Sequence, residues 1–281
     1  MRSLLSKWFQ FAFLVFLPLA SFAATKPIAL VYAGYGACDL CVYGAADMAF
    51  RAGLDVVFVD EASIDYSLFR EAKVWIQPGG HSVEQAVSMG PILMQHVRNF
   101  VNNGGGYVGF CAGSFISTPK IGDSKVDGFG FIPGPTYYHH PDDSQAWQIE
   151  QIEIPEEGKR WVYFAGGPKF EITDADIKFV GAKVMARALN GDIEELYSHY
   201  GRGRIAVSGF HPEANELWKS GKLFFLLGKK RAFKALLETT VYGPVALWDS
   251  SPYFAIDPDG SDYDIAIKMI QFAAFGTIQH Q

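Results

Sequence analysis

Short, almost wholly apolar runs alternate with segments of helical periodicity along the first half of the chain. Four runs are predicted strands: residues 27–32, 54–59, 72–76 and 106–110. Two segments are predicted helices, 42–52 and 92–101, and Gly53 is the predicted end of the first. Strands that are apolar on both faces and alternate with helices indicate a parallel sheet with helices on both faces.

The pattern of apolar residues changes in the second half of the chain. From 121 to 198 the apolar runs are shorter, as at 161–164 and 183–186, which predicts an antiparallel β insertion at one edge or over the site. Residues 203–208 return to the pattern of a core strand. Three helical stretches then predict a helical C-terminal tail: residues 216–227, 232–239 and about 262–275.

The N-terminus has the three parts of a secretory signal peptide. Arg2 and Lys7 precede an apolar core at 8–17, and Ser21-Phe22-Ala23 is a small-x-small cleavage site. The core is shorter than the ~20 residues that a membrane helix needs. We predict cleavage after Ala23 and an exported protein, periplasmic or secreted, without membrane insertion; an uncleaved N-terminal anchor is the alternative.

The charge balance is acidic. The chain has 281 residues and a formal net charge of −6, and removing the two cations of residues 1–23 leaves −8. Nucleic acids and anionic membranes attract clustered Lys and Arg, so we expect neither as a partner. Because no repeat, linker or break in composition interrupts residues 24–281, we expect one domain there.

The segment Gly109-Phe110-Cys111-Ala112-Gly113 follows the last strand of the first half directly. A sharp strand-to-helix turn forces its apex residue into strained backbone, and flanking glycines make room for it. Cys111 would then stand at the end of the sheet, where a helix N-terminus lowers a thiol's pKa. This pattern predicts a nucleophile elbow with a thiol in place of the usual hydroxyl.

About a hundred residues later, Gly209-Phe210-His211-Pro212-Glu213 follows another predicted strand. A catalytic thiol needs a base, and that base needs a third group to fix its tautomer; His211 and Glu213 supply both in one loop. An oxyanion would be bound by the backbone N–H of Ala112 and by that of Gly79 or Gly80. The alternative is that Cys111 is an inert buried thiol.

Gln77-Pro78-Gly79-Gly80, the Cys111 motif and the His211 motif, in this order, resemble the class I glutamine amidotransferase-like superfamily. Within it the chain is most similar to the biotin-protein ligase N-terminal domain family, which also matches the Tyr32–Gly36 loop and Ala165-Gly166-Gly167-Pro168. The resemblance covers roughly residues 27 to 215. It implies a flavodoxin-like fold and a triad of Cys111, His211 and Glu213.

The predicted function is that of an amidotransferase-like thiol hydrolase acting on an amide or ester of a small molecule or peptide. Glutamine amidotransferases commonly carry glutamine four residues after the nucleophile, where this chain has Phe115, which argues against glutamine as the substrate. No cofactor is expected, because no phosphate-binding or complete metal signature is present. A catalytically silent binding or regulatory module is the alternative from another class.

Cys38 and Cys41 are spaced C-x-x-C in the loop after the first strand. In an exported chain this spacing favours a local disulfide, and a redox-active pair or two free thiols are the alternatives. The pair would line the same edge of the sheet as Cys111, so a redox protein built on Cys38 and Cys41 is a third candidate function.

Five further residues are candidate substrate contacts because they lie in loops near the predicted site: Tyr35, His81, Tyr138, Gly166 and Gly167. His81 is equally placed to cap the helix that begins near Ser82. The adjacent His139 and His140 are expected to be solvated on a loop, and no metal site is predicted.

Overall fold

The computed structural model describes residues 26–140, 147–215, 218 and 260–277. The predicted signal peptide lies outside these residues, as do the two predicted helices at 216–227 and 232–239 apart from Trp218. Within the described chain no helix is long and apolar enough to span a bilayer.

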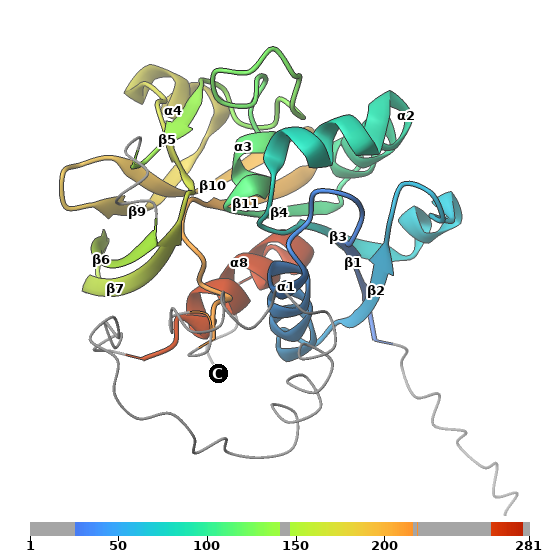
Figure 1. Cartoon of the computed structure of the whole chain (residues 1–281), viewed down its shortest axis with the longest axis horizontal. Helices are drawn as coiled ribbons and strands as arrows, with labels where there is room; N and C mark the ends of the chain where they lie inside the picture. Colours follow the sequence, from blue (N-terminus) through green and yellow to red (C-terminus); the bar gives the residue numbers. More distant parts are fainter. Residues whose placement is uncertain (1–25, 141–146, 216–217, 219–259, 278–281) are drawn as a thin grey trace, which may run out of the picture.

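The centre of the molecule is one large mixed sheet (Figure 1). Its strands follow the order β2 (Asp55–Val59), β1 (Ile28–Tyr32), β3 (Ala72–Gln77), β4 (Gly106–Phe110), β11 (Gly203–Ser208), β10 (Ile193–Tyr200), β9 (Lys183–Ala188), β6 (Trp147–Ile154) and β7 (Gly158–Ala165). The pairings from β2 to β11 are parallel and those from β11 to β7 are antiparallel. The short strands β5 (Thr136–Tyr138) and β8 (Pro168–Phe170) pair with each other, and β8 also pairs with β10. The predicted parallel core with an antiparallel β insertion is confirmed.

Helices cover both faces of the parallel strands (Figure 1). On one face lie α1 (Asp39–Arg51) and α8 (Tyr263–Phe275), and on the other α2 (Ser82–Asn102) and the short α3 (Ala112–Ile116). Alternate residues of β1 belong to the two cores: Ala29 and Val31 to the first, Leu30 and Tyr32 to the second. This division explains why the strand sequences are apolar without alternation.

The last helix is joined to the sheet through its C-terminus. The guanidinium of Arg204 in β11 donates hydrogen bonds of 2.9 Å to the carbonyl oxygen of Ala273 and 3.0 Å to that of Ala274. These carbonyls are in the last turn of α8, where a cation is favoured by unpaired acceptors and the helix dipole. The helix predicted at 262–275 is confirmed, and this contact fixes its position.

The long helix α2 starts ten residues before the predicted one at 92–101. Gly90 has φ 60° and ψ 176°, so the chain leaves helical geometry there and resumes it at Pro91. Proline has no N–H and crowds the preceding turn, which is why the sequence pattern assigned a helix only beyond it. The other elements are a 3₁₀ turn at Tyr66–Arg70 and α4 at Asp174–Val180.

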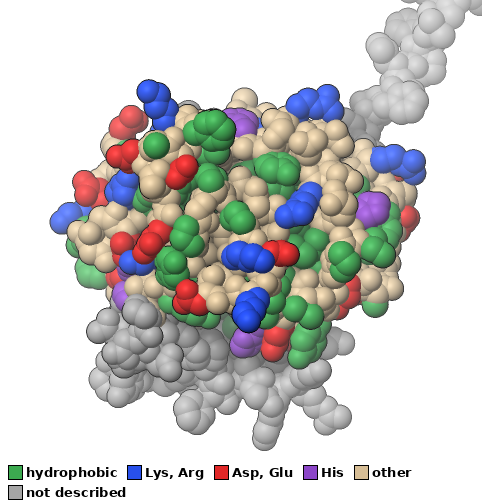
Figure 2. Space-filling view, turned by 90° about the horizontal axis from the view of Figure 1, so that it is seen from above, with side chains coloured by type: hydrophobic (Ala, Val, Ile, Leu, Met, Phe, Trp, Pro, Cys, Tyr) green, Lys and Arg blue, Asp and Glu red, His purple; other side chains and the backbone are tan. Residues whose placement is uncertain are grey.

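The surface on the face shown in Figure 2 mixes the two charge signs. Lys and Arg side chains are interspersed there with Asp, Glu and hydrophobic ones. The absence of a nucleic-acid partner stays a prediction from composition.

Candidate active site

Cys111 occupies the predicted strand-to-helix turn, between β4 and α3, with φ 48° and ψ −102°. A non-glycine residue in such backbone costs on the order of 1–3 kcal/mol, which the surrounding structure must hold in place. The turn is anchored by the backbone N–H of Cys111, which donates to the Ser208 carbonyl oxygen at 2.9 Å. The side chain of Cys111 is buried, with 4% of the residue exposed.

The two flanking glycines are needed because backbone segments meet at the turn. A Cβ added at Gly109 would lie 2.7 Å from the carbonyl carbon of Gly113, and one added at Gly113 would lie 2.2 Å from the Gln77 carbonyl oxygen. Neither space admits a side chain. The two glycines of the G-x-C-x-G pattern are therefore required by the close approach of backbone segments at this turn.

His211 and Glu213 form a buried pair beside Cys111. Nδ1 of His211 is 2.9 Å from Oε1 of Glu213, and neither side chain exposes more than 3% of its surface. Burial alone would lower the pKa of His211, but the negative charges of Cys111 and Glu213 outweigh it and hold that pKa well above its ordinary value. Because Nδ1 faces Glu213, Nε2 is the ring nitrogen left to exchange a proton with Cys111, whose thiol donates to the Ala165 carbonyl oxygen at 3.6 Å.

The loop that carries this pair is fixed by contacts from three directions. The backbone N–H of His211 donates to the Tyr163 carbonyl oxygen in β7 at 2.8 Å. A Cβ at Gly44 in α1 would lie 3.1 Å from Cγ of Glu213, so α1 packs directly on the aliphatic part of this side chain. The Trp218 ring meets the imidazole edge-on, with centroids 5.4 Å apart.

A cavity of about 620 Å³ opens in front of Cys111 and His211. Its walls come from the loops that follow β1, β3, β4 and β11, together with Tyr163, Ala165 and Trp218. These loops leave the carboxyl ends of parallel strands, and the order of the sheet reverses between β1 and β3. Ligands of open α/β sheets bind at this kind of reversal.

Of the three predicted oxyanion residues, Gly80 is among the described residues that line the cavity, and Gly79 and Ala112 are not. Gly80, with φ 133°, lines it, and Gly79 lies against His211: a Cβ there would be 2.7 Å from the imidazole Cε1. Ala112 is the first residue of α3 and is buried. That their N–H groups bind an oxyanion stays a prediction.

The structure separates the five candidate substrate contacts. Tyr35 and His81 line the cavity, and the His81 side chain makes no capping hydrogen bond to α2, contrary to the capping alternative. Tyr138 is outside the described lining and packs edge-on against Phe115, with centroids 5.1 Å apart.

The two candidate glycines are also outside the described lining, next to Ala165, which is part of it. A Cβ at Gly167 would lie 1.6 Å from the Gly209 carbonyl oxygen, so Gly167 allows the backbone to pass the strand end that leads to His211. Gly166, with φ 69°, forms the turn between β7 and β8.

Cys38 and Cys41 are free thiols in the structure, so the predicted disulfide is not formed there and stays a prediction. Cys38 is the N-cap residue of α1, and both thiols line the cavity with Cys111. The Cys41 thiol donates a hydrogen bond to the Cys38 sulfur, which lowers the pKa of Cys38 to about 7 against the effect of burial. Burial and the Cys38 charge raise the pKa of Cys41 well above its ordinary value.

The expectation that His139 and His140 are solvated is wrong. Only 3% of the His139 side chain is exposed, and 15% of that of His140. Their partners are Glu150 in β6 and Glu194 in β10, which sequence analysis did not single out. The consecutive pair Glu194-Glu195 in a strand is a signal from which this cluster could have been found.

Comparison with known proteins confirms the resemblance seen in the motifs. Residues 28–126 match the family model described as biotin-protein ligase, N terminal. The chain is 26% identical over 215 residues to the biotin-protein ligase of Schizosaccharomyces pombe, an alignment that covers 66% of this chain and 33% of that protein. The chain thus spans about a third of the length of this curated relative.

The fold is similar to that of glutamine amidotransferases of known structure. One aligns with a TM-score of 0.53 and 19% identity over 75% of this chain and 97% of its own. Another, from Thermotoga maritima, has a TM-score of 0.50 and 14% identity over 77% of this chain and 86% of its own. At these identities the likeness establishes the fold, which is glutamine amidotransferase-like.

Proposed function

We propose that this domain is a cysteine-dependent hydrolase that cleaves an amide or ester through a thioester on Cys111. The observation that carries the proposal is that a thiol on a strained turn lines the same cavity as His211, which is paired with the buried Glu213. The fold already bears the strain and the buried charge that such a site requires.

The reaction has two halves, acylation and deacylation, and Cys111, His211 and Glu213 take part in both. In the reactive state the proton of Cys111 is on Nε2 of His211, so the thiolate sulfur attacks the substrate carbonyl carbon while Glu213 stabilises the imidazolium through Nδ1. The backbone N–H groups of Ala112 and Gly80 are proposed to hold the oxyanion. The C–N or C–O bond then breaks, and His211 returns its proton to the leaving amine or alcohol.

Deacylation repeats these steps with water. His211 takes a proton from water, the hydroxide attacks the thioester carbonyl, and the C–S bond breaks. The sulfur leaves as a thiolate and recovers its proton from His211. The carboxylic acid is released and the free thiol is restored.

The cavity supports a small acyl substrate. Its volume of about 620 Å³ lies in the range of ligand sites, roughly 300–1,000 Å³. Leu40, Tyr163 and Trp218 give it apolar walls. Glutamine amidotransferases commonly carry glutamine where this chain has Phe115. The Phe115 ring packs in the buried core beside Tyr138 and offers no amide group to a substrate.

A chemically activated ester tests the proposal without a known substrate. With p-nitrophenyl acetate we expect a burst of p-nitrophenol and an acetyl group on Cys111, located by peptide mass spectrometry and removed by hydroxylamine. Cys111→Ala should abolish the burst, and His211→Ala should slow it by ~10²-fold or more. Cys38→Ala is the matched thiol control and should retain the burst. Acetylation confined to Cys38 in the wild type would refute the proposal.

A second candidate function is thiol–disulfide exchange by Cys38 and Cys41, favoured by the lowered pKa of Cys38 in the same cavity. The Cys38 thiolate would attack a partner disulfide, and the buried Cys41 would displace the partner as a dithiol. The partner is thereby reduced and the pair becomes a disulfide. Reduction of a model disulfide that requires Cys38 but not Cys111 would assign this function.

We also propose that the protein is exported, on the signal-peptide pattern of residues 1–23. A binding or regulatory module remains the alternative if ligand binding survives the loss of Cys111.

A further inference from the structure

We propose that His139, His140 and Glu150 bind a divalent transition-metal ion of the zinc type, and that Glu194 orients His139 for this role. The site is separate from the Cys111 cavity: none of the four residues is among the described residues that line it. It joins the segment after β5 to the strands β6 and β10.

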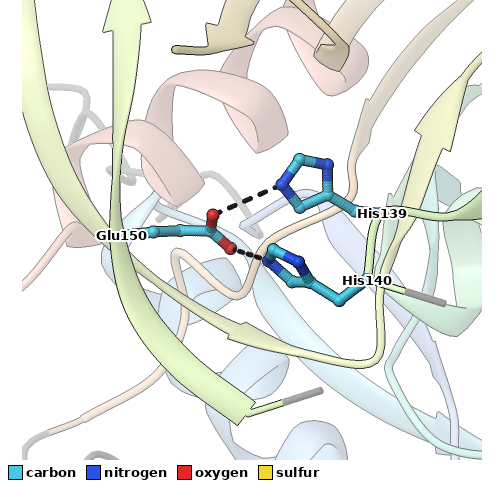
Figure 3. A group of neighbouring side chains, drawn as sticks. All are labelled: His139, His140 and Glu150. Atoms are coloured by element: carbon cyan, nitrogen blue, oxygen red, sulfur yellow. Dashed lines mark hydrogen bonds and ion pairs between the residues drawn. The ribbon is translucent and has the colours of Figure 1, made fainter. Parts of the chain in front are cut away.

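The three ligand atoms converge from two segments of the chain (Figure 3). Nε2 of His140 is 2.6 Å from one oxygen of Glu150, and Nε2 of His139 is 3.3 Å from the other. All three groups offer a donor atom within 4.8 Å of the rest. Two imidazole nitrogens and one carboxylate form a set that binds zinc and leaves room for a further ligand.

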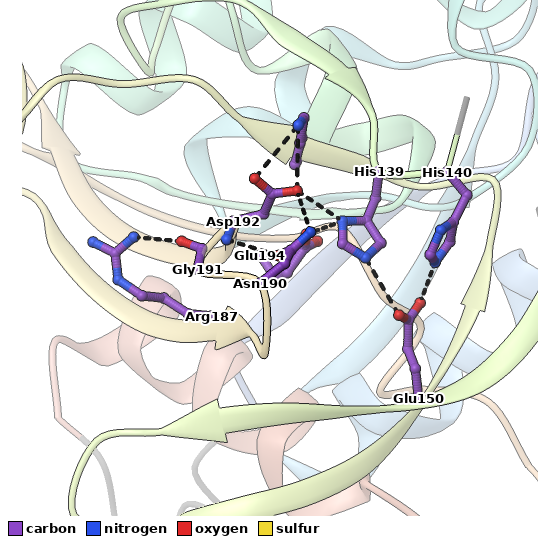
Figure 4. A network of polar contacts seen from close by, with 9 residues as sticks. His139, His140, Glu150, Arg187, Asn190, Gly191, Asp192 and Glu194 are labelled. Atoms are coloured by element: carbon purple, nitrogen blue, oxygen red, sulfur yellow. Dashed lines mark hydrogen bonds and ion pairs between the residues drawn. The ribbon is translucent and has the colours of Figure 1, made fainter. Parts of the chain in front are cut away.

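A contact on the other side of the His139 ring supports the metal site independently. Nδ1 of His139 is 2.7 Å from Oε1 of Glu194, whose side chain is wholly buried (Figure 4). The contact lacks hydrogen-bond geometry, and neither carboxylate oxygen of Glu194 has a hydrogen-bond partner among the described residues. A ring held by a metal at Nε2 must carry its proton on Nδ1, and a small rotation then lets Nδ1–H donate to Glu194. Metal-bound histidines commonly donate to a carboxylate in this way.

The charges also favour a dication. The carboxylates of Glu150, Asp192 and Glu194 surround His139. Among the described residues the cation near them is Lys169, whose Nζ is 3.2 Å from Asp192 Oδ2. With neutral histidines these four groups carry a net charge of −2 in a largely buried place. A divalent ion bound to the two neutral imidazoles would cancel this charge.

The donor atoms limit the kind of metal. Imidazole nitrogen suits zinc, nickel, copper and iron, whereas calcium and magnesium favour oxygen-only sites. The ion would hold the antiparallel insertion against β10. The carbonyl of Glu194 accepts the Gly209 N–H at 2.8 Å, so β10 in turn supports the chain leading to His211.

Binding is tested on the full-length protein, stripped with a chelator and titrated with Zn²⁺. We expect one equivalent to bind and the melting temperature to rise with Zn²⁺ concentration. Cobalt(II) distinguishes this site from the thiols of the cavity, because nitrogen and oxygen ligands give weak visible bands and thiolates add a strong ultraviolet charge-transfer band. The expected spectrum has the visible bands alone.

Variants locate the ion. His140→Ala and Glu150→Gln should each reduce Zn²⁺ affinity at least 100-fold, and Glu194→Gln, as a positioning residue, 10–100-fold. His199→Ala, which replaces an exposed histidine elsewhere, should leave the affinity unchanged. The proposal is overturned if the wild type does not bind Zn²⁺ below ~1 mM, or if the cobalt spectrum contains a thiolate band. Both measurements are made on the wild-type protein, so they do not depend on whether a variant folds.

Discussion

The backbone strain at Cys111 predicts that glycine is tolerated there unusually well. We compare Cys111→Gly with Cys111→Ala, because both variants lack the thiol and differ only in one methyl group and in backbone freedom. At φ 48° and ψ −102° the alanine variant keeps the strain, whereas glycine adopts this backbone readily.

The expected size follows from three contributions. In ordinary buried backbone, replacing alanine by glycine costs about 0.5–1 kcal/mol of backbone entropy and about 0.8 kcal/mol of lost burial. At position 111, release of strain returns about 2 kcal/mol, the middle of the usual range. Cys111→Gly should therefore be more stable than Cys111→Ala by about 0.5 kcal/mol.

The matched control is Ala206→Gly in β11. Ala206 is fully buried and pairs with Val108, in the strand that leads to Cys111. This variant should lose about 1.5 kcal/mol relative to the wild type, so the alanine-to-glycine change should differ by about 2 kcal/mol between the two positions.

Equilibrium unfolding in urea measures both differences, with the slope of each transition checked for equality among the variants. If the change from alanine to glycine costs as much at position 111 as at Ala206, Cys111 is not strained in solution. In that case the fold does not sacrifice stability to present this thiol.

Three shorter predictions concern the same cavity and the N-terminus. The rate of Cys38 alkylation should rise with pH through a midpoint near 7, because the folded-state pKa of Cys38 lies below the ordinary value of 9.0. Cys41→Ala should move this midpoint upward. Cys41→Ser, which retains a hydrogen-bond donor, should move it less. A midpoint near 9 in all three proteins would contradict the hydrogen bond. Gly79→Ala should slow acylation of Cys111 at least tenfold, because the added Cβ would lie 2.7 Å from the His211 ring and displace it. If the folded variant reacts at the wild-type rate, the close approach of Gly79 to His211 is not needed for the reaction. The exported protein should begin at Ala24 by intact-mass measurement, and a chain beginning at Met1 would exclude cleavage.

Much of the fold follows from local sequence. The strands of the parallel core and the helix at the C-terminus lie within a residue or two of their predicted positions, because each must be apolar on the faces that helices or strands cover. The kink at Gly90–Pro91 limited the prediction of α2, since a proline inside a helix has the local pattern of a helix start. The turn at Cys111 was also locally readable: its two glycines exist to let backbone segments touch.

The sequence by itself therefore determined the layered sheet, the turn that carries Cys111 and the strand ends near which His211 and the C-x-x-C pair lie. Tertiary structure decided what surrounds these groups. It packed α1 on the predicted His211–Glu213 pair, and it placed Tyr138 against Phe115 outside the described lining of the cavity. It also buried His139 between Glu150 and Glu194, which are 11 and 55 positions away. Burial and electrostatic contact depend on distances in space, and no local pattern of residues encodes the distance between segments so far apart in the chain.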